Sequence, residues 1–472
     1  MMLHKKTIII ITISLLALIL LIYILFLIFS SSYNIPNVVI LPLQSTSSIS
    51  DLSSLFYNNL RTTITISDEK QEVDLFLLSE DFSFFITQKN ILFENNEKSE
   101  INKFSYNFYN YEKSSSIDII SDRTQMFFTK YKYGRKSKEN FSLCSKNNCD
   151  KTSINLKKFK FMLVEDPIDK ISGGIGLGPN EYIVDGAINL FNELYREKYI
   201  NNLIWYIDYK NEEKKLIIGK LPYEVNNKYN KDDFEFFEMV KVGSVYELNM
   251  MKITIGNNEE NNDDENSDNN IKDRAFQFLQ DYSLIHGPPE YYNKIKNIFF
   301  NKYFSNNQCV ENSFNYKLID YLYISCNEDI SLKDFPPLII YINKNFKFEL
   351  TYDDLFMKSN GQFLFLFVSN KIENYFNKKW HIGEPFLKKY NPVYNPKDNK
   401  IGFYQISKNK KSNYKSAGII GFIILFISIV LIIYLCLFIF RKYRNRKIRR
   451  AAMEMKIEEI SRKFILYKGE NK

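Results

Sequence analysis

The sequence predicts a mainly β, bilobal fold flanked by two transmembrane helices. Two long uncharged apolar stretches lie near the ends of the 472-residue chain. The residues between them form short apolar or alternating runs broken by polar turns, which is typical of strands. The chain is also longer than one hydrophobic core usually organises, so we expect at least two lobes.

The apolar stretches cover residues 7–29 and 417–440, and neither contains a charged side chain. A helix of this length crosses about 30 Å of hydrocarbon, so each stretch is long enough to span a bilayer. The apolar part of a cleaved signal peptide is usually only about 7–15 residues long. We therefore predict that residues 7–29 are an uncleaved signal anchor, with a signal peptide cleaved near Ser30 to Ser32 as the alternative.

Basic residues flank both stretches on the same side. Lys5 and Lys6 precede the first, and a run of Lys and Arg at 441–450 follows the second. Because such residues concentrate on the cytosolic side of membrane spans, residues 1–6 and the tail 441–472 are predicted to be cytosolic. The region between the spans is then lumenal or extracellular, in a secretory or endomembrane compartment or at the cell surface.

The net charge of +8 comes from one end of the chain. Residues 441–472 hold twelve Lys or Arg and four Glu, so the remainder is close to neutral. No nucleic-acid-binding surface is therefore expected. The segment 441–450 suits contact with anionic lipid, although it is equally typical of a plain stop-transfer signal.

Four cysteines lie between the spans, where an oxidising compartment would favour disulfides. Their number and spacing predict the pairs Cys144–Cys149 and Cys309–Cys326. Asn140 begins the glycosylation sequon Asn-Phe-Ser. No Cys/His cluster has the spacing of metal ligands, so neither a metal nor another cofactor is expected.

Seven runs between the spans have the length and pattern of strands: Asn37–Leu41, Val73–Leu78, Leu203–Ile207, Leu216–Ile218, Lys252–Ile255, Leu338–Ile342 and Phe363–Val368. Residues 186–195 have helical spacing, and residues 451–467 could form a short amphipathic helix. The acidic run 257–270 is predicted to be a disordered surface loop.

Several segments match the motifs of one family in the family's own order. The strongest is Trp380–Tyr390 followed by Val393–Asn395 and Ile401–Phe403, which is similar to W-x-L-G-x-x-F-L-R-x-Y…V-F-D…I-G-F. Weaker matches are Gly173–Gly178, Tyr246–Ile255, Ser283–Pro288, and Cys326 with Phe335–Tyr341. Together these segments resemble the pepsin-like (A1-type) aspartic proteases over residues 41–405. The resemblance implies an N-lobe at 37–200, a C-lobe at 201–406 and a cleft between them.

The chemistry of this family needs one aspartate per lobe, each in a D-[TS]-G-[TS] loop, sharing a proton and activating a water. Ungapped matching places Leu78–Asp81 (LSED) and Leu279–Tyr282 (LQDY) at these loops. Leucine cannot bind or transfer a proton, so the resemblance implies a pseudoprotease that binds a protein or peptide. The other predicted loop residues are Ser79, Glu80, Gln280 and Ser283.

Two alternatives stay open. The loops carry the similar triplets Asp81-Phe82-Ser83 and Asp281-Tyr282-Ser283, so an active membrane-bound aspartic endopeptidase could use Asp81 and Asp281. The chain could instead be a structural or trafficking subunit that works through its cytosolic tail.

The flap of the family is also altered. Tyr133 and Gly134 resemble the flap's Tyr-Gly, but the basic run Arg135–Lys138 replaces the small residues that normally follow. A basic flap tip would favour acidic partners, and a solvated hairpin turn is the alternative. His286 and His381 are expected to be structural.

Overall fold

The computed structural model describes residues 38–45, 60–88, 107–125, 131–143, 154–167, 171–179, 187–209, 213–240, 245–256, 275–316, 319–371, 379–404, 438 and 441–461. The chain divides into two compact units, residues 1–405 and 406–472, and each is considered by itself. The predicted span 7–29, the acidic run 257–270 and the predicted span 417–440, except Phe438, lie outside the described residues. No described helix is both long enough and apolar enough to cross a membrane.

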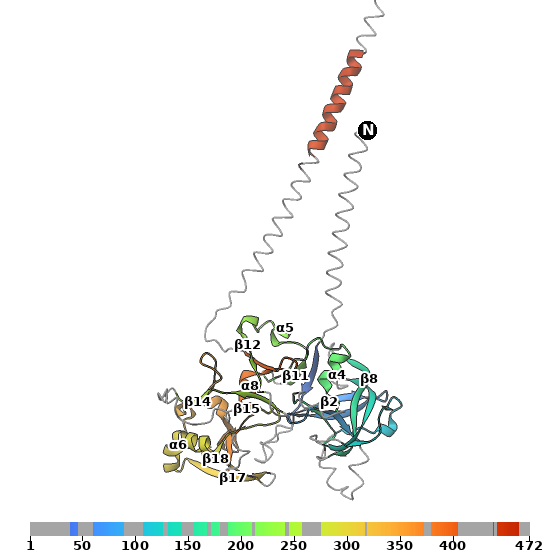
Figure 1. Cartoon of the computed structure of the whole chain (residues 1–472). Coiled ribbons are helices and arrows are strands. Elements are labelled where there is room, and N and C mark those ends of the chain that lie inside the picture. Colours follow the sequence, from blue (N-terminus) through green and yellow to red (C-terminus); the bar gives the residue numbers. More distant parts are fainter. Residues whose placement is uncertain are drawn as a thin grey trace, which may run out of the picture. The chain divides into compact units, whose positions relative to one another are not determined.

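A six-stranded antiparallel sheet joins the beginning, middle and end of the first unit. Its order is β1-β11-β10-β25-β26-β12. Its strands are β1 (Val39–Leu43), β10 (Trp205–Asp208), β11 (Lys214–Ile218), β12 (Phe234–Glu238), β25 (Val393–Asn395) and β26 (Lys400–Tyr404). This sheet therefore ties the N-terminal half of the unit to its C-terminal half (Figure 1).

The N-terminal half is built on an eight-stranded sheet in the order β2-β3-β9-β4-β8-β7-β5, with β6 also paired to β7. Its strands are β2 (Arg61–Ile66), β3 (Gln71–Leu78), β4 (Phe84–Thr87), β5 (Asp118–Ile119), β6 (Thr124–Gln125), β7 (Tyr131–Ser142), β8 (Asn155–Pro167) and β9 (Gly173–Gly176). A further pairing of β2 with β7 curls the sheet round on itself. Phe84, Phe141, Phe159 and Phe161 pack ring to ring in its core.

The C-terminal half contains two sheets. The larger has the order β13-β15-β24-β16-β23-β18-β22-β21, with β17 paired to β18, and the smaller has the order β14-β19-β20. The strands are β13 (Tyr246–Asn249), β14 (Lys252–Ile255), β15 (Ala275–Phe278), β16 (Ile285–His286), β17 (Cys309–Tyr316), β18 (Ile319–Asn327), β19 (Leu338–Tyr341), β20 (Lys347–Leu350), β21 (Phe356–Ser359), β22 (Gln362–Phe365), β23 (Phe367–Asn370) and β24 (Trp380–Ile382).

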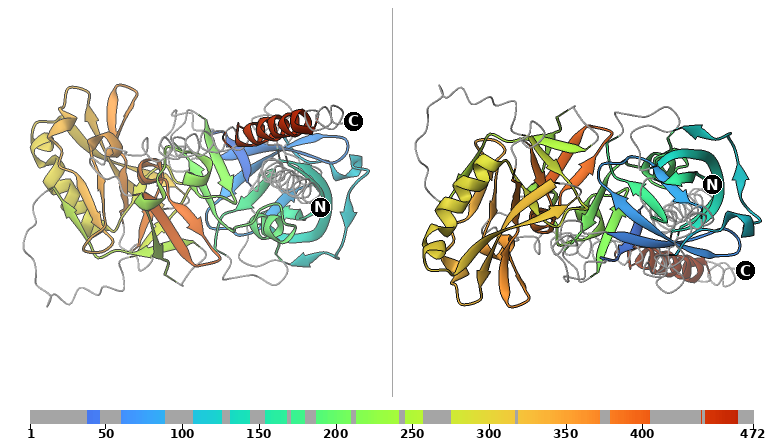
Figure 2. Two further views of the ribbon diagram at one scale, coloured as in Figure 1. Left: turned by 90° about the horizontal axis from the view of Figure 1, so that it is seen from above. Right: turned by 90° about the horizontal axis from the view of Figure 1, so that it is seen from below.

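Helices are few and mostly short. They are α4 (Leu190–Arg196), α5 (Pro222–Val225), α6 (Pro289–Ser305), α7 (Tyr352–Leu355) and α8 (Glu384–Tyr390), with 3₁₀ turns η2 (Tyr111–Lys113), η4 (Lys231–Asp233) and η6 (Leu332–Asp334). In both views of Figure 2 the yellow helix α6 lies along strands of the C-terminal half, and it contacts β17 and β23. Its buried face consists of Tyr292, Ile295, Phe299, Phe300 and Tyr303.

The prediction of a mainly β fold is confirmed. Each of the seven predicted runs overlaps a strand, although Phe363–Val368 belongs to two strands, β22 and β23. The predicted helix at 186–195 begins later, at Leu190, because the side chain of Asn189 accepts a hydrogen bond from the Asn192 amide and caps it. The long helix α6 was not predicted.

The second unit contains a helix over the described residues 441–461. Its described part already includes the ten residues that precede the amphipathic helix predicted at 451–467. All of these residues are exposed, including Met453, Ile457 and Ile460.

Candidate functional site

Two loops meet where the halves of the first unit join, and both are built in the same way. In the N-terminal half the chain leaves β3, turns through residues 79–83 and returns as β4. Strand β9 passes between them, parallel to β3 and antiparallel to β4. In the C-terminal half β15, residues 279–284 and β16 repeat this arrangement around β24.

Strand register shows which residues of the two loops correspond. Leu77 lies opposite Ile175, and Phe278 lies opposite Ile382. A glycine follows each isoleucine and touches the backbone of its loop. A Cβ on Gly176 would lie 2.4 Å from the Phe82 carbonyl carbon, and one on Gly383 would lie 2.2 Å from the Leu284 carbonyl oxygen. The corresponding pairs are therefore Leu78 with Leu279, Ser79 with Gln280, Glu80 with Asp281, and Asp81 with Tyr282.

Leu78 and Leu279 occupy the same place in the two loops, and each packs into its own half. Leu78 packs against Phe85, Met162, Val164 and Ile188. Leu279 is fully buried in a cluster with Val245, Tyr282, Leu284, Tyr321 and Val368. Neither side chain can hold or pass a proton, so no proton can be shared between these two positions.

The residues that follow the leucines bind the two loops to each other. The Ser79 hydroxyl accepts hydrogen bonds from the backbone amides of Gln280, at 2.7 Å, and Asp281, at 3.3 Å. It donates to the Gln280 side-chain oxygen at 3.0 Å. The Gln280 amide nitrogen donates in turn to the Tyr394 hydroxyl. Ser79 and Gln280 are buried, so this series of hydrogen bonds holds the two loops together at the junction.

Asp81 turns back into its own loop. Its carboxylate accepts from the Ser83 amide at 2.7 Å and from the Ser83 hydroxyl at 2.6 Å. Its carbonyl oxygen accepts from the Gly178 amide at 2.8 Å. Asp81 is 1% exposed and corresponds to Tyr282 rather than to Asp281. Its carboxylate therefore caps the turn of the N-terminal loop.

Asp281 is placed differently. The residue as a whole is partly exposed, but the Oδ1 atom of Asp281 is buried and has no hydrogen-bond partner among the described residues. Burial raises the pKa of Asp281 to about 6; the Ser79 hydroxyl opposes this rise, and the charge of Glu80 adds to it. Glu80 itself is exposed. The two glycine positions of the expected loops thus carry acidic side chains, and the charge of Glu80 acts on Asp281.

Comparison with known families agrees with this architecture. Residues 62–406 match the family described as eukaryotic aspartyl protease. The chain belongs to this family. No curated protein matches it.

The flap region of this family member does not have the arrangement expected from the sequence. Tyr133 and Gly134 lie on β7, opposite Gln125 and Thr124 of β6. The basic run Arg135–Lys138 also lies inside β7, paired on one side with β8, so the prediction that it forms the flap tip or a hairpin turn is wrong. Residues 126–130, which connect β6 to β7 in the sequence, lie outside the described residues.

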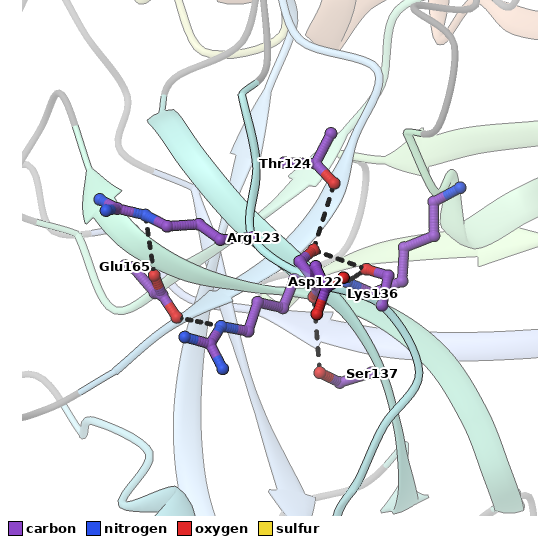
Figure 3. A network of polar contacts seen from close by, with 8 residues as sticks. Asp122, Arg123, Thr124, Lys136, Ser137 and Glu165 are labelled. Carbon is purple, nitrogen blue, oxygen red and sulfur yellow. Dashed lines mark hydrogen bonds and ion pairs between the residues drawn. The ribbon is translucent and has the colours of Figure 1, made fainter.

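A polar network holds this strand in place (Figure 3). The Glu165 carboxylate lies between two guanidinium groups, 3.0 Å from Arg123 Nε and 2.5 Å from Arg135 Nε. Arg123 also covers the ring of Tyr133, with its guanidinium carbon 4.2 Å from the ring centroid. Glu165 therefore offsets part of the positive charge of the run.

Two histidines of the family's C-terminal motifs are cross-strand neighbours. His286 on β16 pairs with His381 on β24, with ring centroids 5.0 Å apart. Burial lowers the pKa of His286 to about 3 and that of His381 to about 4. Both rings are therefore uncharged at neutral pH. His286 Nε2 lies 3.0 Å from Asn370 Oδ1, which supports a structural role.

The other predicted site residues lie away from the junction or outside the described residues. Cys309 and Cys326 form the predicted disulfide between β17 and β18, with Sγ atoms 2.05 Å apart. Cys144 and Cys149 lie outside the described residues. Asn140 lies at the surface of β7, where its side-chain nitrogen donates to Asp68 at 2.9 Å. Ser283 is half-buried. No group of three His, Cys, Asp or Glu among the described residues could hold a metal ion.

Sequence reasoning missed several residues at the junction. Tyr209, directly after β10, is buried, and its hydroxyl has no hydrogen-bond partner among the described residues. Burial raises the pKa of Tyr209 well above its usual value, and the charges of Glu384 and Asp281 add to this. Tyr394 belongs to the Val393–Asn395 match, but its bond to Gln280 could not be read from the motif. Such contacts depend on which segments the fold brings together.

Proposed function

We propose that this chain is a non-catalytic member of the aspartyl protease family that binds a protein or peptide. The observation that carries the proposal is the pair of leucines at corresponding positions of the two junction loops. The reaction of the family needs an acid and a base at these positions, and leucine is neither. A chain with this site can bind a ligand but has no dyad there to activate water.

The rest of the scaffold supports binding without chemistry. Gly176 and Gly383, which allow each loop to pack on its neighbouring strand, are present. Ser79 and Gln280 hold the loops together through buried hydrogen bonds. The residues that hold the loops in place are retained, whereas the catalytic acids are replaced. The proposed function therefore needs the folded loops and not the acids.

The rival function is an active endopeptidase that uses Asp81 and Asp281. One observation favours it: burial raises the pKa of Asp281 to about 6, which is a value that suits a general acid or base. Against it, the Asp81 carboxylate accepts two hydrogen bonds from Ser83 within its own loop. The two aspartates also stand at non-corresponding positions, so they do not form the symmetric pair of the family.

We further propose that the binding domain is anchored in a membrane, with residues between the spans lumenal or extracellular and the tail cytosolic. The uncharged stretches 7–29 and 417–440 and the basic run that follows support this orientation. The alternative, a structural or trafficking subunit that acts through the cytosolic tail, predicts a different outcome when the tail is removed. Deleting residues 441–472 would then abolish correct localisation and partner recovery, whereas a lumenal binding module would keep its partner.

The proposal is tested by peptide cleavage. The purified full-length chain is incubated with a peptide library from acidic to neutral pH, beside Asp81→Ala and Asp281→Ala. We expect no cleavage by any of the three, with circular dichroism showing that each is folded. Cleavage by the unsubstituted chain that either substitution abolishes would establish the endopeptidase instead.

A further inference from the structure

We propose that His286 and His381 form an acid-sensitive switch for the C-terminal junction loop, residues 279–284. The loop is held in place while both rings are neutral, and protonation of the pair loosens it. The inference concerns regulation of the junction. It goes beyond the proposed function and does not depend on whether the chain binds or cleaves a peptide.

The two histidines contact each other across neighbouring strands. His286 on β16 lies directly opposite His381 on β24, and their ring centroids are 5.0 Å apart. His286 is 4% exposed, whereas His381 is partly exposed, which gives a proton a route to the pair. Two imidazolium charges this close together would repel each other, and burial makes each charge more costly.

The polar contacts of His286 suit only the neutral ring. Its Nε2 lies 3.0 Å from Asn370 Oδ1, and an amide oxygen can only accept, so Nε2 carries the proton. The Nδ1 atom of His286 is buried and has no hydrogen-bond partner among the described residues. A second proton would be added at Nδ1, which would create a buried charged donor without an acceptor.

The side chains that pack on the pair are uncharged at neutral pH. The His286 ring contacts the ring of Tyr321 on β18, with centroids 5.9 Å apart. The His381 ring contacts the ring of Tyr282, which belongs to the loop itself, also with centroids 5.9 Å apart. On the other side of His381, the residue opposite it on β15 is Gln277. These neighbours provide no negative charge for an imidazolium.

The charged residues near the pair do not provide one either. The charge of Lys379 lowers the pKa of His381 and adds to the effect of burial. Lys379 Nζ lies 2.9 Å from the carboxylate of Glu247, a buried acid on β13, so this acid is already paired. Neither histidine forms an ion pair with an acid in the part of the chain that the structure describes. A protonated pair would therefore be destabilised where it stands.

Both histidines adjoin the loop. Strand β16, which carries the first, directly follows it and is only two residues long. The residues that follow His381 hold the loop through the backbone. The Ile382 carbonyl accepts from the Leu279 amide at 3.0 Å, and the Glu384 amide donates to the Tyr282 carbonyl at 2.8 Å. Separation of the pair would therefore act directly on the loop.

The direction of the pH effect follows from linkage. The pKa is about 3 for His286 and about 4 for His381 against an ordinary 6.5, so the folded loop loses stability as pH falls below 6.5. At about pH 4.5 each histidine favours the opened pair by up to about a hundredfold. Asp281 acts in the opposite direction, because its raised pKa means that its protonation in acid stabilises the loop, by less than about a hundredfold. The two histidines together exceed this effect.

Amide hydrogen exchange of the full-length chain tests the switch, with rates corrected for the intrinsic effect of pH. We expect the protection of residues 279–284 to fall at least tenfold between neutral pH and about pH 4.5, and that of the β2–β3 hairpin to change much less. In the double variant His286→Gln with His381→Gln the loop should lose no protection in acid, because Asp281 still titrates. Glutamine retains a donor for Asn370.

The chain offers a matched control, since it has only one other histidine, His4. His4→Gln should respond to acid as wild type does, and each single variant, His286→Gln or His381→Gln, should give an intermediate response. The switch is overturned if the loop of the wild-type chain stays protected at about pH 4.5. It is also overturned if the double variant loses as much protection as wild type.

Histidine-selective NMR of the unsubstituted chain gives a second measurement that does not depend on the folding of any variant. Two of the three histidine rings should remain neutral at about pH 5.5, where an ordinary histidine is mostly charged. Three rings that all titrate near pH 6.5 would overturn the switch. The non-catalytic function would be unaffected, because only peptide cleavage tests it.

Discussion

Replacing Asp281 with asparagine should stabilise the folded chain at neutral pH. The ordinary pKa of its carboxyl group is 3.8, and burial raises it to about 6 in the folded chain. A shift of one pKa unit corresponds to about 1.4 kcal/mol, so the ionised form is disfavoured by at most about 3 kcal/mol. Because the residue is partly exposed, solvent screens part of this, and we expect a gain of about 1–2 kcal/mol in Asp281→Asn.

The sign and pH range follow from linkage. The folded chain binds a proton at Asp281 more tightly than the unfolded chain, so its stability falls as pH rises from about 4 to about 6. Above about pH 6 the full penalty is present, and below about pH 4 it disappears. The advantage of Asp281→Asn should therefore be largest at neutral pH and should vanish in acid.

Urea unfolding of the full-length chain at several pH values measures this directly. Wild type and Asp281→Asn are compared with Asp329→Asn, which removes an exposed acid and should change stability little. The reasoning is refuted if Asp281→Asn is no more stable than wild type at neutral pH. It is also refuted if the difference does not shrink between about pH 6 and pH 4.

Three further substitutions test the scaffold of the junction. Ser79→Ala removes the acceptor for the Gln280 and Asp281 amides and should destabilise the chain by about 1–3 kcal/mol in urea unfolding; an unchanged midpoint would contradict the role of Ser79. Gly176→Ala places a Cβ 2.4 Å from the backbone of the loop and should lower the yield of folded protein sharply. In the matched variant Gly361→Ala the new Cβ lies 3.9 Å from its nearest neighbour, so this substitution should be tolerated better, at a cost of about 1 kcal/mol. Equal effects of the two glycine substitutions would show that the close approach does not matter. Replacing both Cys309 and Cys326 with serine opens a link across 17 residues and should lower stability by about 3 kcal/mol, seen as a lower melting temperature that reducing agent no longer changes.

Much of the β architecture was predictable because it depends on local patterns. The short alternating run Lys252–Ile255 coincides with a strand, as the two-residue period of its polar and apolar residues predicts. The sequence predicts one strand at Phe363–Val368, but pairing with different neighbours divides the run between β22 and β23. Pairing is a long-range property that a run of apolar residues does not encode.

Helix α6 was not predicted, although its buried residues have helical spacing. Its buried residues Tyr292, Ile295 and Phe299 have helical spacing, and the pair Pro288–Pro289 marks its beginning. Its sequence is rich in aromatic residues, however, and these have only modest helix propensity and are common in strands. Packing of this apolar face on the neighbouring strands decides the conformation, and that contact is formed by distant segments.

The candidate site was predictable in its position but not in its contacts. The two motif loops could be aligned from the sequence, and strand register now pairs Leu78 with Leu279. The apparent match between Asp81 and Asp281 was misleading, because the similar triplets that contain them are one position out of register, which places the two carboxylates in different surroundings. The Tyr209 hydroxyl, which has no hydrogen-bond partner among the described residues, had no signal in the sequence, since its burial depends on the packing of distant segments.

The most direct test is whether the folded full-length chain cleaves any peptide between about pH 3 and pH 8, the range in which carboxyl groups titrate. Because leucine fills both corresponding positions of the junction loops, we predict that no product forms at any pH and that Asp81→Ala and Asp281→Ala behave like wild type. Cleavage that depends on either aspartate would contradict this, and would mean that the two out-of-register acids form a working pair.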